Sequence, residues 1–191
     1  EMVAIRRVRN MEFRWALVAC LGVMVLGTLK GIVVAIVLSL LGLMYLAYDP
    51  RVDELRRKPG TNVFRPRSPE HPEDEAIPGL LIARPEDRLY FGNAANVAAK
   101  MQALARDADP KVVLLDCSAI PGFEYTALKM LVEGEEKQRE QGREMWLAAL
   151  NPEALDLVQR TPLAERLGRE RMFFTVEQAV AAFEARGPAS S

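Results

Sequence analysis

The chain has 191 residues, a formal net charge of −1 and a mean hydropathy of −0.01. This balance excludes a disordered, collagenous or strongly basic protein, and gives no global charge on which nucleic-acid binding would rest. Two cysteines, Cys20 and Cys117, and one histidine, His71, exclude a disulfide framework, a cysteine-rich zinc site and paired-histidine metal sites. We therefore expect no metal and no cofactor.

The averages hide a division of the chain into two regions. From Trp15 to Tyr48, 34 residues carry a single formal charge, on Lys30. One straight helix of that length would run about 50 Å, whereas a hydrocarbon core is only ~30 Å thick. The sequence Gly-Thr-Leu-Lys-Gly at residues 27–31 predicts a turn, and therefore two membrane helices, roughly Glu12–Leu29 and Gly31–Tyr48. Lys30 is interpreted as a turn residue whose ammonium reaches the membrane surface.

Basic residues flank this segment on both sides. Since basic residues mark cytoplasmic ends, we expect a hairpin with both ends in the cytoplasm. A signal peptide is excluded because the apolar block is too long and no small-residue cleavage site follows it. The remaining alternative is a buried hairpin in the core of a soluble protein. The flanking basic residues are Arg6, Arg7, Arg9 and Arg14 before the segment, and Arg51, Arg56, Arg57 and Lys58 after it.

Residues 49–77 are dense in proline and charge. They contain five prolines with Arg, Asp and Glu between them, and little hydrophobic periodicity. Such a segment cannot bury enough apolar surface to fold alone, so we predict an extended connector. His71 lies here beside acidic residues, and we interpret it as part of a solvated loop rather than as a metal ligand.

The first half of residues 78–186 predicts strands followed by helices. Two short apolar runs, residues 79–83 and 89–91, predict an antiparallel hairpin. Asn93 or Asn96 can cap a helix that continues to about Asp107. A buried strand over Lys111–Asp116 is then followed by a loop, residues 117–123, and by a helix over Glu124–Gln141.

The second half continues the alternation. Met145–Ala149 predicts a strand, and Asn151-Pro152-Glu153 combines a cap, a first-position proline and a first-turn acid at a helix start. A short helix at residues 162–168 and a strand at residues 172–174 follow. The last helix opens on a capping box, residues 175–178, and its apolar face comprises Val176, Ala179, Val180 and Phe183. This order predicts an α/β domain with a mixed sheet and helices packed on it.

Nearly the whole chain resembles the C-terminal part of the SulP family of anion permeases, the sulfate permeases. The matching motifs are residues 6–13 with 22–32, residues 57–65 (Arg-Lys-Pro-Gly-Thr-Asn-Val-Phe-Arg), and residues 78–82 with 89–94. The remainder is similar to a STAS domain, the module shared with bacterial anti-sigma-factor antagonists. The resemblance implies a terminal transmembrane hairpin at 1–48, a linker at 49–77, a cytoplasmic STAS domain at 78–186 and a tail at 187–191.

The resemblance also implies a function. The chain would be the C-terminal fragment of a secondary anion transporter for sulfate, bicarbonate, chloride or dicarboxylates, multi-pass in the cell (inner) membrane. Its STAS domain would regulate transport or assembly through protein contacts. The expected partners are membrane lipid, the missing upstream transporter helices, a second copy in a homodimer and a cytoplasmic regulatory protein. The substrate-binding residues would lie upstream, so this fragment alone is not expected to transport.

The loop after Lys111–Asp116 is the candidate regulatory site. In the antagonists, this loop ends in an Asp-Ser pair at a helix start, and the serine is phosphorylated. That pair corresponds here to Glu124-Tyr125, followed by Thr126. A helix start offers free N–H groups that suit an anion. The candidate residues are Asp116, Ser118, Glu124, Tyr125 and Thr126, with Thr126 or Ser118 as the acceptor; alternatively, both hydroxyls only hydrogen-bond the loop backbone.

Three other functions compete with this interpretation. One is a membrane-tethered phosphoswitch resembling the anti-sigma-factor antagonists. Another is a nucleotide-binding regulatory module, although no glycine-rich phosphate loop is present. An enzyme is the weakest alternative, because residues 78–186 contain no histidine and their carboxylates are spread over helix surfaces. Cys117 is interpreted as a small buried hydrophobic residue.

Overall fold

The computed structural model describes residues 28–187. The chain divides between Tyr48 and Asp49 into two compact units. Most of the first predicted membrane helix, Glu12–Leu29, lies outside the described residues, and so does Cys20.

The first unit contributes helix α3, Thr28–Tyr48. It begins three residues before the predicted Gly31, so Lys30 and Gly31 lie in its first turn and not in a turn between two helices. Within residues 28–187, no helix combines the length and the apolar character that a membrane crossing requires. Large apolar side chains of α3 are nonetheless 49–79% exposed: Leu29, Ile32, Val33, Ile36, Val37, Leu40, Leu41, Leu43, Met44, Tyr45 and Tyr48.

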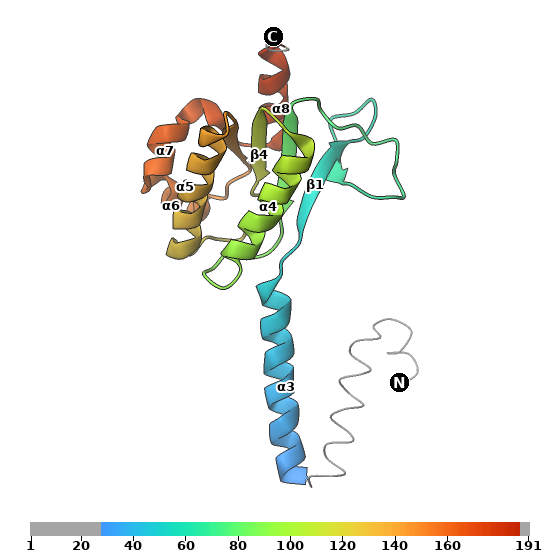
Figure 1. Ribbon diagram of the computed structural model, residues 1–191, viewed down its shortest axis with the longest axis vertical. Coiled ribbons are helices and arrows are strands. Elements are labelled where there is room, and N and C mark those ends of the chain that lie inside the picture. The colour runs from blue at the N-terminus through green and yellow to red at the C-terminus, as the bar shows by residue number, and fades with distance from the viewer. Residues whose placement is uncertain (1–27, 188–191) are drawn as a thin grey trace. The chain divides into compact units, whose positions relative to one another are not determined.

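The second unit is built on a six-stranded mixed sheet with the order β2-β1-β3-β4-β5-β6 (Figure 1). Strands β3 to β6 are parallel to one another, and β1 is antiparallel to both of its neighbours, β2 and β3. The predicted mixed α/β class is therefore confirmed. The strands are β1 (Val52–Arg57), β2 (Phe64–Pro66), β3 (Leu80–Pro85), β4 (Val112–Asp116), β5 (Glu144–Ala148) and β6 (Met172–Phe173).

Two predictions on the β1 side of the sheet are wrong. Residues 49–77 are not a connector, because β1 and β2 both belong to the sheet. The predicted hairpin of residues 79–83 with 89–91 does not form either. The antiparallel partner of β3 is β1, with Val52 opposite Pro85, whereas Leu89 makes only an isolated parallel bridge to Phe123. The apolar run at 89–91 is too short to extend the sheet past that bridge.

The helices follow the sequence within a few residues. Asn151 caps α6 by accepting a hydrogen bond from the Ala154 N–H at 2.8 Å, and Thr175 caps α8 through the Gln178 N–H at 3.3 Å. These two of the three predicted caps are confirmed. The helices are α4 (Ala94–Ala108), α5 (Tyr125–Glu140), α6 (Pro152–Gln159), α7 (Pro162–Leu167) and α8 (Val176–Ala185), with a 3-10 turn at Arg169–Arg171 before β6.

The sheet separates two parts of the hydrophobic core. On one face, Leu115 of β4 packs with buried residues of α4, α5, α6 and α7. On the other face, Leu114 and the fully buried Trp146 pack against α8. Because successive strand residues point to opposite faces, the uninterrupted apolar run of β4 supplies both parts of the core.

Candidate functional site

The predicted regulatory loop, residues 117–123, follows β4 at the carboxyl edge of the parallel strands and leads through Glu124 into α5. The residue just before it, Asp116, is fully buried. One of its carboxylate oxygens accepts a hydrogen bond from Arg84 Nε at 2.7 Å, and the other accepts the Ser118 N–H at 2.9 Å. A buried carboxylate is tolerated only when it is paired in this way. Asp116 therefore fixes the start of the loop through its hydrogen bond to Ser118, and it is not accessible to a partner.

Asn151 holds the opposite side of the loop. Its side-chain amide donates to the carbonyl of Ile120 at 3.2 Å and to that of Pro121 at 3.1 Å, while its oxygen caps α6. The sequence indicated only the cap. At the start of the loop, the Cys117 N–H donates to the Ala148 carbonyl at 2.9 Å. The loop is thus tied to β5 and α6 as well as to β3.

A second loop, residues 88–93, lies beside the first. The buried Asn93 shapes it by accepting the Tyr90 N–H at 3.0 Å and donating to the Arg88 carbonyl at 2.9 Å. The Glu124 N–H donates to the Leu89 carbonyl at 3.0 Å and joins the two loops. Asn93 was expected only as a helix cap. In the structure it occupies the cap position of α4 without a capping bond from its side chain.

Four of the five predicted site residues are exposed on the surface of these two joined loops and the start of α5. Ser118, Glu124 and Thr126 are exposed, and Tyr125 exposes 82% of its surface. Tyr125 and Thr126 are the first two residues of α5, and Glu124 occupies its cap position without a capping bond from its side chain. Among the described residues, the hydroxyls of Ser118 and Thr126 form no hydrogen bond with the loop backbone. These four residues present hydroxyl, carboxylate and aromatic groups to a partner. Asp116 is buried and does not belong to this surface.

A family model described as the STAS domain matches residues 71–179. The chain belongs to the STAS-domain family. Sulfate transporter 1.1 of Arabidopsis thaliana is 24% identical over 189 residues, which cover 94% of this chain and 29% of that protein. High affinity sulfate transporter 2 of Stylosanthes hamata is 23% identical over 192 residues, covering 95% of this chain and 29% of that protein. The chain thus spans less than a third of the curated relatives it matches. These matches confirm the resemblance to the sulfate permeases.

Solved structures agree on the fold. SLC26A9 matches 97% of this chain and 32% of that chain with a TM-score of 0.80 at 16% identity. Murine Slc26a9, an anion transporter in the inward-facing state, matches 96% of this chain and 30% of that chain with a TM-score of 0.78 at 17% identity. An anti-sigma factor antagonist from Mycobacterium paratuberculosis covers 58% of this chain and 90% of its own, with a TM-score of 0.50 at 19% identity.

Cys117 of the STAS domain is almost completely buried, as the sequence predicted. Burial raises the pKa of its thiol far above the ordinary range, and the neighbouring Asp116 raises it further. Because the thiolate is the reactive form, this raised pKa disfavours reaction of the Cys117 thiol at neutral pH.

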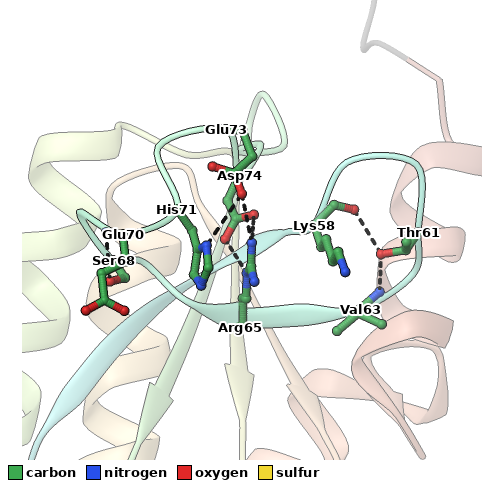
Figure 2. Close-up of polar contacts among 9 residues, drawn as sticks. All are labelled: Lys58, Thr61, Val63, Arg65, Ser68, Glu70, His71, Glu73 and Asp74. Carbon is green, nitrogen blue, oxygen red and sulfur yellow. Dashed lines mark hydrogen bonds and ion pairs between the residues drawn. The ribbon is translucent and has the colours of Figure 1, made fainter.

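A second polar cluster lies in the segment after β1 (Figure 2). It is separate from the loop of residues 117–123, which we call the STAS loop. Arg65 of β2 makes a two-pronged pair with Asp74, with nitrogen–oxygen distances of 2.7 and 2.8 Å, and its guanidinium also reaches Glu73 at 3.2 Å. The hydrogen bond from Arg65 holds the pKa of the Asp74 carboxyl below its usual value, outweighing the opposing effect of burial. His71 lies 3.5 Å from Glu73 at the edge of this cluster.

This cluster pins the loop and does not form a metal site. Both carboxylate oxygens of Asp74 are occupied by Arg65. Within residues 28–187, no three His, Cys, Asp or Glu side chains lie together as metal ligands would.

The STAS domain also has an apolar groove between α4 and α5, lined by Met101, Leu131 and Met145 among others, with a cavity volume of about 60 Å³. Small-molecule pockets usually measure about 300–1,000 Å³, so this groove is too small for a nucleotide.

Proposed function

We propose that the chain is the STAS-bearing end of a secondary anion transporter of the sulfate permease class. The observation that carries the proposal is the continuous similarity to sulfate transporters over 94% of the chain, from the apolar segment through the STAS domain. Sulfate is the first candidate substrate because the matched relatives bear that name, with bicarbonate, chloride and dicarboxylates as the other members of the class. We expect no catalytic activity of its own, because these relatives are transporters.

The apolar segment is proposed to be a hairpin in the inner membrane of the cell, with the STAS domain in the cytoplasm. Its 34 residues with one charge and the exposed aliphatic side chains of α3 support this proposal. Apolar surface costs about 25 cal/mol per Å² when it remains in water, so these side chains need lipid or other helices around them. Membrane lipid and further transporter helices are the proposed partners of this unit.

The STAS loop is proposed to regulate transport or assembly by protein contact. Its exposed residues stand on a frame that Asp116, Asn151 and the bond between Glu124 and Leu89 hold in place. A surface held in one conformation binds a partner without the entropic cost of ordering it. The partner is proposed to be the second copy in a homodimer or a cytoplasmic regulatory protein.

A phosphoswitch is the second candidate, supported by the exposed hydroxyl of Thr126 in the first turn of α5. Phosphate there would meet the N–H groups of the helix start. Phosphopeptide mass spectrometry of protein from native cells tests this mechanism. Phosphorylated Thr126 or Ser118 would support it, and a fully covered but unmodified peptide would rule it out.

The transporter proposal is tested by grafting. This chain replaces the 189 aligned residues of Sulfate transporter 1.1, and uptake of labelled sulfate is measured in cells that lack their own sulfate transport. We expect the graft to restore uptake relative to the same transporter truncated before the replaced segment. Equal membrane levels of both proteins, measured by immunoblot after carbonate washing, are the control. No gain in uptake at equal membrane levels would contradict the proposal.

A further inference from the structure

One lysine holds the first residues of the STAS unit against α4. Lys100 Nζ lies 2.6 Å from a carboxylate oxygen of Asp49 and donates to the carbonyl of Pro50 at 2.9 Å. Asp49 and Pro50 directly follow Tyr48, the last residue of α3. A single ammonium therefore makes two charge-assisted contacts with the junction at which the apolar helix ends.

The residues after the junction are fixed through their backbone. The Glu86 N–H donates to the Arg51 carbonyl at 2.9 Å, and Val52 begins the pairing of β1 opposite Pro85. Residues 49 and 50 are thus bonded by the Lys100 side chain, and residues 51 and 52 by the backbone of β3 and the residue that follows it. The contacts of Lys100 hold the chain just before the first pair of β1, so their loss should let that pair open more often.

The junction and the STAS loop lie at the same edge of the sheet. Pro85 ends β3 beside the carboxyl end of β4, and β1 is two strand spacings from β4, about 10 Å. The Glu124 N–H joins the STAS loop to Leu89, and loop 88–93 continues directly into α4, which carries Lys100. An unbroken series of bonded and packed groups therefore runs from the STAS loop to Asp49.

We propose that Lys100 is a latch that couples the STAS loop to the junction with α3. A partner that shifts the STAS loop would shift loop 88–93 and α4, and Lys100 would pass that shift to Asp49 and Pro50. Lys100 is 39% exposed and Asp49 54% exposed. Exposed ion pairs contribute little to stability, so the latch can open while the domain stays folded. Its role in signalling to the membrane rests on the proposed function, whereas the latch itself does not.

The latch is tested by hydrogen exchange of the full chain in detergent micelles, followed by mass spectrometry of the peptide covering residues 48–53. Lys100→Met should accelerate exchange there about two- to fivefold, the range expected for losing one exposed ion pair. Peptides from β4 should be unchanged. Lys129→Met, at an exposed α5 lysine with no ion pair among the described residues, is the matched control and should change nothing. Exchange in Lys100→Met equal to that of the wild type would overturn the latch.

The coupling is tested by a double-variant cycle in the same assay. Glu124→Pro removes the N–H that joins the STAS loop to Leu89, together with the exposed carboxylate of Glu124, at a position whose φ of −85° is close to that of proline. As a single substitution, it should accelerate hydrogen exchange at residues 48–53. In the Lys100→Met background, it should cause no further acceleration there. Additive effects of the two substitutions would overturn the coupling. If Glu124→Pro exposes the β4 amides, Asn151→Ala replaces it as the loop perturbation. Both experiments measure hydrogen exchange and not transport, so their results do not depend on whether the proposed transport function is correct.

Discussion

The two sides of the sheet are held together by different forces. On the parallel side, all five residues of β4 are buried, and β5 is buried from Met145 onward. On the antiparallel side, β1 buries only Leu55, and ion pairs connect its surroundings. These pairs join Arg56 and Arg67 to Glu54, Arg65 to Asp74, and Arg57 to Glu184 of α8. Hydrophobic burial is insensitive to pH near neutrality, whereas paired carboxylates lose their charge in acid. The two sides should therefore respond differently to truncation and to pH.

The largest effect is expected in the parallel side. Trp146→Ala removes a fully buried ring that packs 5.1 Å from the Phe173 ring and 4.5 Å beneath the Arg186 guanidinium. The free energy of unfolding should fall by about 3–5 kcal/mol, measured by urea titration of the detergent-solubilised chain with circular dichroism. Phe174→Ala, which truncates a ring that is 85% exposed, is the control and should change stability by less than about 0.5 kcal/mol. Equal losses of stability in the two variants would mean that burial of the ring does not determine its contribution.

The next effect concerns the buried ion pair between Arg84 and Asp116 at the start of the STAS loop. Arg84→Ala leaves the Asp116 carboxylate buried without its guanidinium partner. Because Arg84 is about a quarter exposed, the expected loss is about 2–3 kcal/mol, at or below the lower end of the range for a fully buried pair. Arg56→Ala, which breaks a pair on the antiparallel side, should cost less than about 1 kcal/mol. The same urea titration compares them, and a larger loss for Arg56→Ala would reverse the comparison.

A smaller effect is expected where the STAS loop meets α6. Asn151→Ala removes the α6 cap and both bonds to the loop carbonyls, for a loss of about 1–2 kcal/mol. Thr175→Ala, which removes the α8 cap alone, should cost about 1 kcal/mol. Hydrogen exchange should accelerate at residues 117–123 only in Asn151→Ala. Protection of that loop in the variant would show that Asn151 does not hold it.

The smallest effect is a change in titration on the antiparallel side. The Arg65 hydrogen bond lowers the folded-state pKa of Asp74. The pair therefore stabilises the fold above the ordinary aspartate pKa of about 3.9, and this contribution is lost as the pH falls through the lowered folded value. Arg65→Gln should move the Asp74 titration midpoint upward in carboxyl NMR. An unchanged midpoint would mean that Arg65 is not the cause.

The same contrast decides how much of the fold the sequence could predict. Strands β3 to β5 are short apolar runs, and the starts of α6 and α8 carry caps, so their places follow from local pattern. The segment of β1 has a single buried apolar residue among charges, and the ion-pair partner of its Arg57, Glu184, lies 127 residues later in the chain. Nothing local distinguishes such a strand from a solvated linker. The apolar run at 89–91 is too short to form a strand beyond its single bridge to Phe123.

The candidate site shows the same limit. The position of the STAS loop and the start of α5 were predictable from the buried strand that precedes them. That Asp116 lies beneath the loop was not, because its partner Arg84 is 32 residues earlier in the chain. The role of Asn151 as a cap was visible, whereas its bonds to Ile120 and Pro121 were not. Lys100 gave no signal, since a lysine on a helix is usually a solvated residue.

We propose that the exposed residues of the STAS loop regulate anion transport, whereas the groups beneath them only support the loop. The most direct test is sulfate uptake by the grafted transporter carrying Tyr125→Ala and Thr126→Ala together. Both side chains are exposed, so stability should change by less than about 0.5 kcal/mol per substitution. We predict a several-fold change in uptake at an unchanged membrane level and urea midpoint. Unaltered uptake in this double variant would contradict a regulatory role of the exposed STAS-loop residues.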